Sequence, residues 1–186
     1  MVKPVYNLPR DEQDEGAVAR HWLAALPENY PQDDRARIAD ACDLLVRCRG
    51  GEILETGETQ VRHLLSCADI LVRLRMDAQT IVAALLNGCL ARPDVTEEQI
   101  SERFGPGIAR MVADLARIDQ IANVDAVIAD KDQNQHEENL RRLLLGIAED
   151  VRVVLVVLAE RLHLMRTIKH LDEARRRKIA GDSQRV

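Results

Sequence analysis

Apolar residues recur three or four positions apart through most of this chain, and that spacing limits its fold more than any other feature of the sequence. Between residues 15 and 26 they are Val18, Trp22, Leu23 and Leu26. Aromatic residues make up only 2% of the 186 residues, so leucine, alanine, valine and isoleucine must fill the core. A core of this kind is typical of packed helices. The sequence therefore predicts an all-α fold, with several helices in one compact domain.

Local signals predict where several of these helices begin and end. Asp77 is placed to cap a helix, and we expect that helix to run through residues 83–92. Thr96 and Gln99 have the spacing of a capping box for a short helix. Pro106 suits the first position of the helix that follows. These signals divide the middle of the chain into three helices.

Two segments in the second half of the chain depart from the simple helical pattern. Residues 123–136 are polar and acidic and lack strong periodicity, which predicts a loop. The β-branched run at residues 153–157 is compatible with a strand. Helical periodicity brackets this run, so we interpret it as part of a buried helix that starts after Asp150. Further helices are expected from His136 and over residues 172–180.

Charge and cysteine content exclude several classes of protein. The net charge of −5 argues against a general nucleic-acid binder, although a nucleotide pocket needs only a few local cations. The four cysteines form no C-x-x-C pair and fall in apolar helical patterns, so we expect buried thiols. No signal peptide opens the chain, and its longest apolar run, residues 153–159, is too short to span a membrane. We therefore expect a cytoplasmic protein with no membrane partner.

Histidines are the first candidates for chemistry, because the sequence contains neither a Gly-rich phosphate loop nor a nucleophile elbow. His21, His136 and His170 are expected at the surface. His63 and His163 instead lie on apolar helices, where an imidazole must find a partner. A lone histidine of this kind is more often a satisfied core group than a metal ligand, and the residues themselves leave both interpretations open.

A polar amide and a glycine stand in the middle of the apolar stretch at residues 83–92. Glycine costs about 1 kcal/mol relative to alanine inside a helix. Gly88 is therefore tolerated where the backbone or a ligand must approach closely, or where a side chain has been lost. The Asn87-Gly88 pair is the feature that any functional interpretation has to explain.

Five features, in order along the chain, resemble those of one family. His63 stands 24 residues before Asn87, residues 83–88 resemble A-A-L-L-H-D, residues 102–105 resemble an F-G turn, residues 138–142 resemble E-N-F-R-K, and residues 158–167 resemble L-A-D-R-x-H-N-M-R-T. From about residue 40 onward the chain is similar to the N-terminal HD hydrolase domain of the long RelA/SpoT proteins, which handle the alarmone (p)ppGpp. The resemblance implies a helical HD domain over residues 41–186, preceded by an arm and a first helix in residues 1–40.

In active members the resemblance implies a Mn²⁺ site made by one histidine, the H-D pair and the aspartate of L-A-D-R. The metal would activate water to remove the 3′-pyrophosphate. The matching positions here are His63, Asn87, Gly88 and Glu160. Asn87 offers a neutral amide and Gly88 has no side chain, so one imidazole and one longer carboxylate remain. A divalent cation needs charge and several fixed ligands, and we expect no metal or other cofactor.

Glu160 should remain buried even without a metal, and a buried carboxylate is costly without a partner. We expect it to pair with one of four nearby groups: Arg62, Arg92, Arg161 or His63.

The positions that the resemblance assigns to a nucleotide pocket have changed as well. The basic loop that grips guanine has lost its cation and gained an anion, and an acidic pair after H-D is absent. The asparagine after L-A-D-R-x-H is a leucine, and a histidine at the end of the second helix is an arginine. These vestigial pocket positions are Arg49, Leu54, Glu55, Thr56, Ala91, Arg92, Leu164 and Thr167.

This set of changes resembles the RelA branch of the family, in which a silent hydrolase domain precedes a synthetase that transfers pyrophosphate from ATP to GTP or GDP. We expect the chain to be the N-terminal piece of such a GTP pyrophosphokinase, acting in the stringent response by packing on the synthetase domain and biasing its activity. Two alternatives stay open. One is a degenerate pocket that still binds a guanine nucleotide, ppGpp or GDP, as an effector. The other is weak metal-dependent hydrolysis through His63 and Glu160.

Overall fold

The computed structural model describes residues 8–9, 12–128, 150–168 and 173, and these residues are mostly helical. They contain no β-strand, and an isolated bridge joins Ile53 to Thr59. The predicted all-α fold is therefore confirmed. None of the described helices combines the length and the apolar character needed to cross a membrane. In chain order the elements are α1 (Glu15–Ala24), α2 (Gln32–Arg49), α3 (Gln60–Arg73), α4 (Ala78–Leu85), the 3₁₀ helix η1 (Cys89–Ala91), α5 (Glu97–Phe104), α6 (Pro106–Ile128) and α8 (Val151–Thr167).

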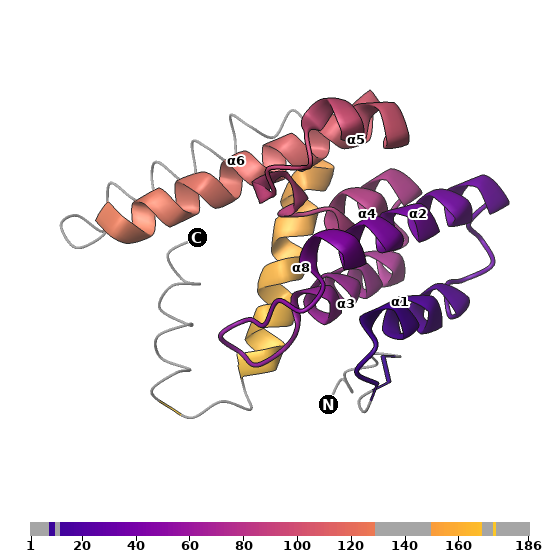
Figure 1. Cartoon of the computed structure of the whole chain (residues 1–186), viewed down its shortest axis with the longest axis horizontal. Coiled ribbons are helices and arrows are strands. Elements are labelled where there is room, and N and C mark those ends of the chain that lie inside the picture. The colour runs from indigo at the N-terminus through magenta and orange to yellow at the C-terminus, as the bar shows by residue number, and fades with distance from the viewer. Residues whose placement is uncertain (1–7, 10–11, 129–149, 169–172, 174–186) are drawn as a thin grey trace.

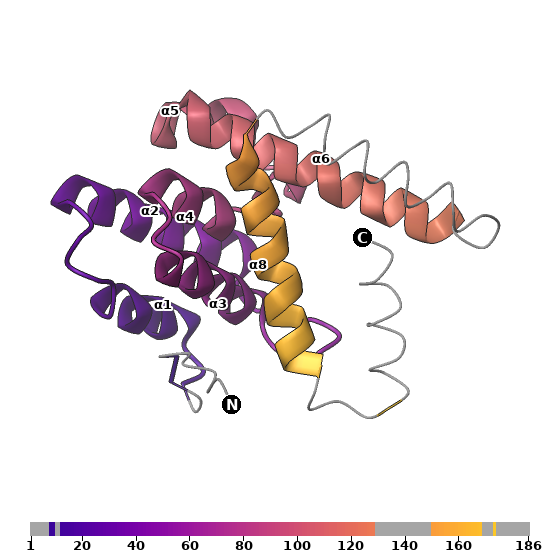
Figure 2. The ribbon, with the colours of Figure 1, turned by 180° about the vertical axis from the view of Figure 1, so that it is seen from behind.

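Helices α1 to α4 form a stack, and α8 runs across it (Figure 1; Figure 2). Within the stack, α2 and α3 each pack against both α1 and α4. Helix α8 packs along α3 and also contacts α4 and α6, while α5 packs on α6. The turn after α4 and the start of α3 each approach the middle of α8.

The core is aliphatic, as the composition requires. Leu45, Leu64 and Ile81 are fully buried on the inward faces of α2, α3 and α4. Val18 and Trp22 bring α1 into the same hydrophobic cluster as the later helices. The four cysteines are buried free thiols, which confirms the expectation from their apolar surroundings.

The predicted helix starts are confirmed. Asp77 accepts a hydrogen bond of 2.8 Å from the backbone N–H three residues further on, at the start of α4. Thr96 and Gln99 form the reciprocal capping box of α5. Asp150 caps α8, and residues 153–157 lie inside that helix.

The prediction of one helix through residues 83–92 is wrong. Helix α4 ends at Leu85, and the chain then turns into the 3₁₀ helix η1. Gly88 has φ +74°, a left-handed conformation that a right-handed helix cannot contain and that side-chain-bearing residues adopt at a cost. Gly88 is therefore the residue of the turn that separates α4 from η1, and it is not a defect inside a helix.

The predicted loop at residues 123–136 is wrong in its first part, because α6 continues to Ile128. Residues 121–128 contain no proline or glycine, so polarity alone does not end the helix. The rest of the predicted loop, the helix expected from His136 and the helix expected over residues 172–180 lie outside the described residues, apart from residue 173.

Candidate functional site

The four positions that match the implied metal ligands come from three different elements. His63 lies in the first turn of α3, Asn87 and Gly88 lie in the turn after α4, and Glu160 lies in the middle of α8. His63 and Asn87 are buried, while Gly88 and Glu160 are half-buried. The Asn87 Nδ2 group donates a hydrogen bond of 2.9 Å to Glu160 Oε1. A ligand atom of His63 lies within 4.8 Å of the Glu160 carboxylate. The fold thus brings these three side chains together.

Glu160 has a different hydrogen-bonding partner from the ones expected. Its donor is the neutral amide of Asn87, so the prediction of an arginine or histidine partner is wrong. Arg62 instead donates to backbone carbonyls of the N-terminal segment at residues 9 and 12. Arg92 donates to the Cys48 carbonyl at 2.7 Å and pairs with a different glutamate. The arginine side chains satisfy nearby backbone groups, and an amide in the adjacent turn satisfies Glu160.

Arg49 borders the space that a side chain at position 88 would enter. Its Nη1 donates to the Gly88 carbonyl at 3.3 Å. A Cβ added to Gly88 would lie 3.5 Å from the Arg49 Cζ atom. Glu52 holds this guanidinium in place, with 3.1 Å between Arg49 Nε and Glu52 Oε2. A positive charge therefore stands where the resemblance places an anionic metal ligand.

These donors do not fit the Mn²⁺ ion that the resemblance implies for active members. The set consists of one imidazole, one amide and one carboxylate, with a guanidinium beside the fourth position. Asn87 Oδ1 is buried and accepts no hydrogen bond from the described residues. A single neutral oxygen supplies no charge to offset the dehydration of a divalent cation.

The vestigial pocket positions are divided between different parts of the structure. Leu54, Glu55 and Thr56 lie in the loop before α3, which is closed by a hydrogen bond of 2.8 Å from Gly57 N to the Leu54 carbonyl. Ala91 and Arg92 are exposed at the end of η1, and Leu164 and Thr167 are half-buried near the end of α8. These groups do not line one common cavity.

A hollow of about 500 Å³ does gather three of the vestigial pocket and metal positions. Arg49, Gly88 and Ala91 line it together with Arg117 and Asp119 of α6. Burial and the negative charge of Glu160 raise the pKa of Asp119, while Arg161 and Arg49 oppose that effect. Asp119 also reaches solvent, which screens part of the repulsion.

The sequence interpretation missed Arg117 and Asp119. The available signal was a pair of charged residues two positions apart at the end of an apolar helical pattern. That signal is weak, because charged residues on a helix most often face solvent.

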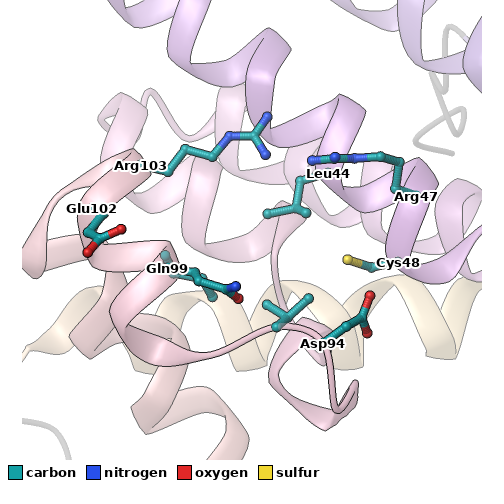
Figure 3. Close-up of a pocket in the computed structure, with 9 residues that line it drawn as sticks. Leu44, Arg47, Cys48, Asp94, Gln99, Glu102 and Arg103 are labelled. Carbon is teal, nitrogen blue, oxygen red and sulfur yellow. The ribbon is translucent and has the colours of Figure 1, made fainter.

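A second hollow, also about 500 Å³, opens between α2 and α5 and is drawn in Figure 3. Leu44, Arg47 and Cys48 line it from α2, and Gln99 and Arg103 line it from α5. Its lining includes none of the vestigial metal or pocket positions, so it is separate from the candidate site.

Glu58 joins the two histidines that the sequence placed on apolar helices. His163 Nε2 lies 2.8 Å from Glu58 Oε2, and His63 Nδ1 lies 3.6 Å from the same oxygen. Burial opposes ionisation of Glu58, but the hydrogen bonds and charges of His163 and His63 outweigh it and lower its pKa to about 2. The expectation that both imidazoles find a partner is confirmed. This partner could not be predicted from the sequence, since 105 residues separate Glu58 from His163.

Comparisons with known proteins agree with the helical architecture. A family model described as "HD domain" matches residues 41–186. The chain is 35% identical over 164 residues to a guanosine-3′,5′-bis(diphosphate) 3′-pyrophosphohydrolase of Aquifex aeolicus, covering 88% of this chain and 22% of that protein.

Two further relatives carry other names. A GTP pyrophosphokinase of Myxococcus xanthus is 30% identical over 85% of this chain and 20% of its own length. The bifunctional (p)ppGpp synthase/hydrolase SpoT of Escherichia coli K12 is 29% identical over 88% of this chain and 23% of its own length. The chain thus spans about a fifth of the length of these relatives.

The Asn87–Glu160 hydrogen bond predicts a measurable coupling between the two side chains. Asn87→Ala removes the donor to a half-buried carboxylate, so we expect a loss of about 1–3 kcal/mol in the free energy of unfolding. A double-mutant cycle with Glu160→Ala, followed by urea denaturation, should give a coupling energy of at least about 0.5 kcal/mol.

The matched control pairs Asn87→Ala with Asp77→Ala, at the opposite end of α4 and too far away to touch it. These two changes should be additive. Additivity in the Asn87–Glu160 cycle as well would contradict the importance of this bond.

Proposed function

The chain belongs to the HD domain family, and we propose that it is a catalytically silent (p)ppGpp hydrolase-like domain. Its relatives, which are named as (p)ppGpp hydrolases and GTP pyrophosphokinases, support a role in guanosine tetraphosphate metabolism. In the proposal the domain belongs to a RelA-type GTP pyrophosphokinase and regulates the synthetase domain of the same parent chain during the stringent response.

The Asn87–Glu160 hydrogen bond is the observation that carries the proposal of silence. It satisfies Glu160 with a neutral group taken from one of the positions where a metal ligand is expected. Arg49 supplies a positive charge beside Gly88. Both contacts stabilise the polar interior without a metal ion. They therefore favour a domain that keeps its fold and lacks the hydrolytic metal.

An exposed apolar stripe on α8 supports a regulatory contact. Val151, Leu158 and Leu162 are 67%, 57% and 42% exposed. Positions 151, 158 and 162 lie on one face of a helix, since the intervals are seven and four residues. Exposed apolar side chains gathered on one face are typical of interaction surfaces. The synthetase domain is the proposed partner of this stripe. The relatives named as a GTP pyrophosphokinase and as a (p)ppGpp synthase/hydrolase are far longer than this chain.

Hydrolysis is tested directly with the purified chain, ppGpp and Mn²⁺. We expect no release of GDP above the uncatalysed background, because the ligand set cannot hold the ion that would activate water. The Aquifex aeolicus relative, assayed in parallel, is the positive control. Mn²⁺-dependent GDP release that disappears in a His63→Ala variant would refute silence and support residual hydrolysis.

Regulation is tested in the parent protein with changes on the α8 stripe. We expect Leu158→Glu combined with Leu162→Glu to change the rate of (p)ppGpp synthesis by severalfold, because a charge in the contact opposes docking of the synthetase domain. Leu74→Glu is the matched control, since Leu74 is 58% exposed but lies at the end of α3. An unchanged rate with the α8 variant, in a folded protein, would argue against docking through this surface.

A guanine nucleotide effector is the second candidate, favoured by the hollow that contains Arg49 and Arg117. If this hollow binds ppGpp or GDP, titration calorimetry should detect binding to the wild-type chain and at least about tenfold weaker binding to Arg49→Gln, because a charge-assisted phosphate contact is lost. Arg47→Gln is the control, because Arg47 lies on the same helix but lines the other hollow. Absence of heat from both nucleotides at millimolar concentration would eliminate this candidate.

A further inference from the structure

Three possible metal ligands converge where the start of α3 meets the end of α8. They are Glu58, His63 and His163, and each offers a ligand atom within 4.8 Å of the other two. The three side chains are 18%, 11% and 3% exposed, so Glu58 marks the edge that solvent reaches. Two imidazoles and a carboxylate form a ligand set that zinc and similar transition metals prefer.

We infer that Glu58, His63 and His163 form a binding site for a divalent transition metal, with Zn²⁺ as the best match. In a tetrahedral zinc site, bonds of about 2.0–2.2 Å place neighbouring ligand atoms about 3.3 Å apart. The Glu58 Oε2 atom lies 2.8 Å from His163 Nε2 and 3.6 Å from His63 Nδ1, on either side of that value. Small side-chain movements would therefore open room for the ion.

The surrounding structure holds the ligands in place before any metal arrives. Glu58 directly precedes Thr59, which caps α3, and its carbonyl accepts a hydrogen bond of 2.8 Å from Leu54 N. The two imidazole rings are 4.9 Å apart between centroids and inclined by 62°. Thr167 Oγ1 lies 3.4 Å from His163 Nε2 and donates to the His163 carbonyl at 3.0 Å. Rigid neighbours of this kind lower the cost of arranging ligands around an ion.

This site differs from the one that the family resemblance implies. It shares His63 with that site, but Glu58 and His163 are not among the four implied positions. A neighbouring group, made of His63, Cys67 and Glu160, also lies within 4.8 Å and shares the same histidine. The Asn87 amide already donates a hydrogen bond to the Glu160 carboxylate. The Glu58 group offers two imidazoles, whereas the neighbouring group offers one, and the Glu58 group is the one we assign.

Without a metal, the same three side chains form a hydrogen-bonded cluster. Glu58 accepts a hydrogen bond from His163, and its Oε2 atom lies 3.6 Å from His63 Nδ1. The experiment must therefore separate metal binding from ordinary hydrogen bonding. Its readouts are metal content and histidine signals, which are independent of (p)ppGpp chemistry and of the proposed regulation.

Metal binding is measured on the purified full chain after chelator treatment and dialysis against Zn²⁺. We expect about one equivalent of zinc by elemental analysis. In a nitrogen-detected NMR titration, the ring signals of His63 and His163 should shift, while those of the exposed His21 should not. Co²⁺ serves as a second probe, because tetrahedral coordination gives it strong visible absorption.

Variants assign the ligands. Glu58→Gln keeps the shape of the side chain, and we expect it to weaken Zn²⁺ binding by about tenfold or more, with the same loss for His163→Asn. Glu160→Gln and His21→Ala should bind zinc like the wild type. Circular dichroism confirms that each variant is folded.

Three results would overturn the assignment: no zinc retained by the wild type, zinc retained equally by Glu58→Gln and His163→Asn, or zinc lost in Glu160→Gln alone. The last result would place the ion at the His63, Cys67 and Glu160 group. The wild-type NMR titration decides whether both histidines are ligands even if His163→Asn fails to fold.

Discussion

The hydrogen bond from Asn87 to Glu160 joins the turn after α4 to the middle of α8, and the polar interior depends on it. Glu160 is half-buried on α8, which packs on α3, α4 and α6, so its carboxylate needs a donor. Asn87 supplies one at 2.9 Å. The amide thus satisfies the Glu160 carboxylate by a hydrogen bond within the chain, without a metal ion.

Features set by neighbouring residues could be predicted from the sequence. The caps at Asp77 and Asp150 and the capping box at Thr96 depend on contacts within two to three residues, so the sequence contains both partners of each bond. The helical spacing of apolar residues predicted the all-α fold and its aliphatic core for the same reason. Part of the candidate site followed from resemblance, because the motif strings fix which positions correspond to the family's ligands.

Contacts between distant segments could not be predicted in this way. Arg49 and Gly88 are 39 residues apart, and nothing in either segment indicates that the guanidinium would border the glycine. Glu160 was expected to pair with an arginine or with His63, but the packing of α8 against the turn after α4 brings Asn87 to it instead. Helix α4 ends where Gly88 adopts a left-handed conformation. Glycine permits that conformation but does not require it, so the end of the helix could not be predicted from the residue type alone.

The position of Arg49 also determines what a side chain at position 88 would contact. Aspartate tolerates the left-handed conformation of position 88 better than most residues do, so the backbone itself would accept Gly88→Asp. The new carboxylate would, however, emerge against the Arg49 guanidinium and form an ion pair there. Asn87 would still donate its hydrogen bond to Glu160. Gly88→Asp alone would therefore not complete the ligand pattern that the resemblance describes, because position 87 would have to change as well.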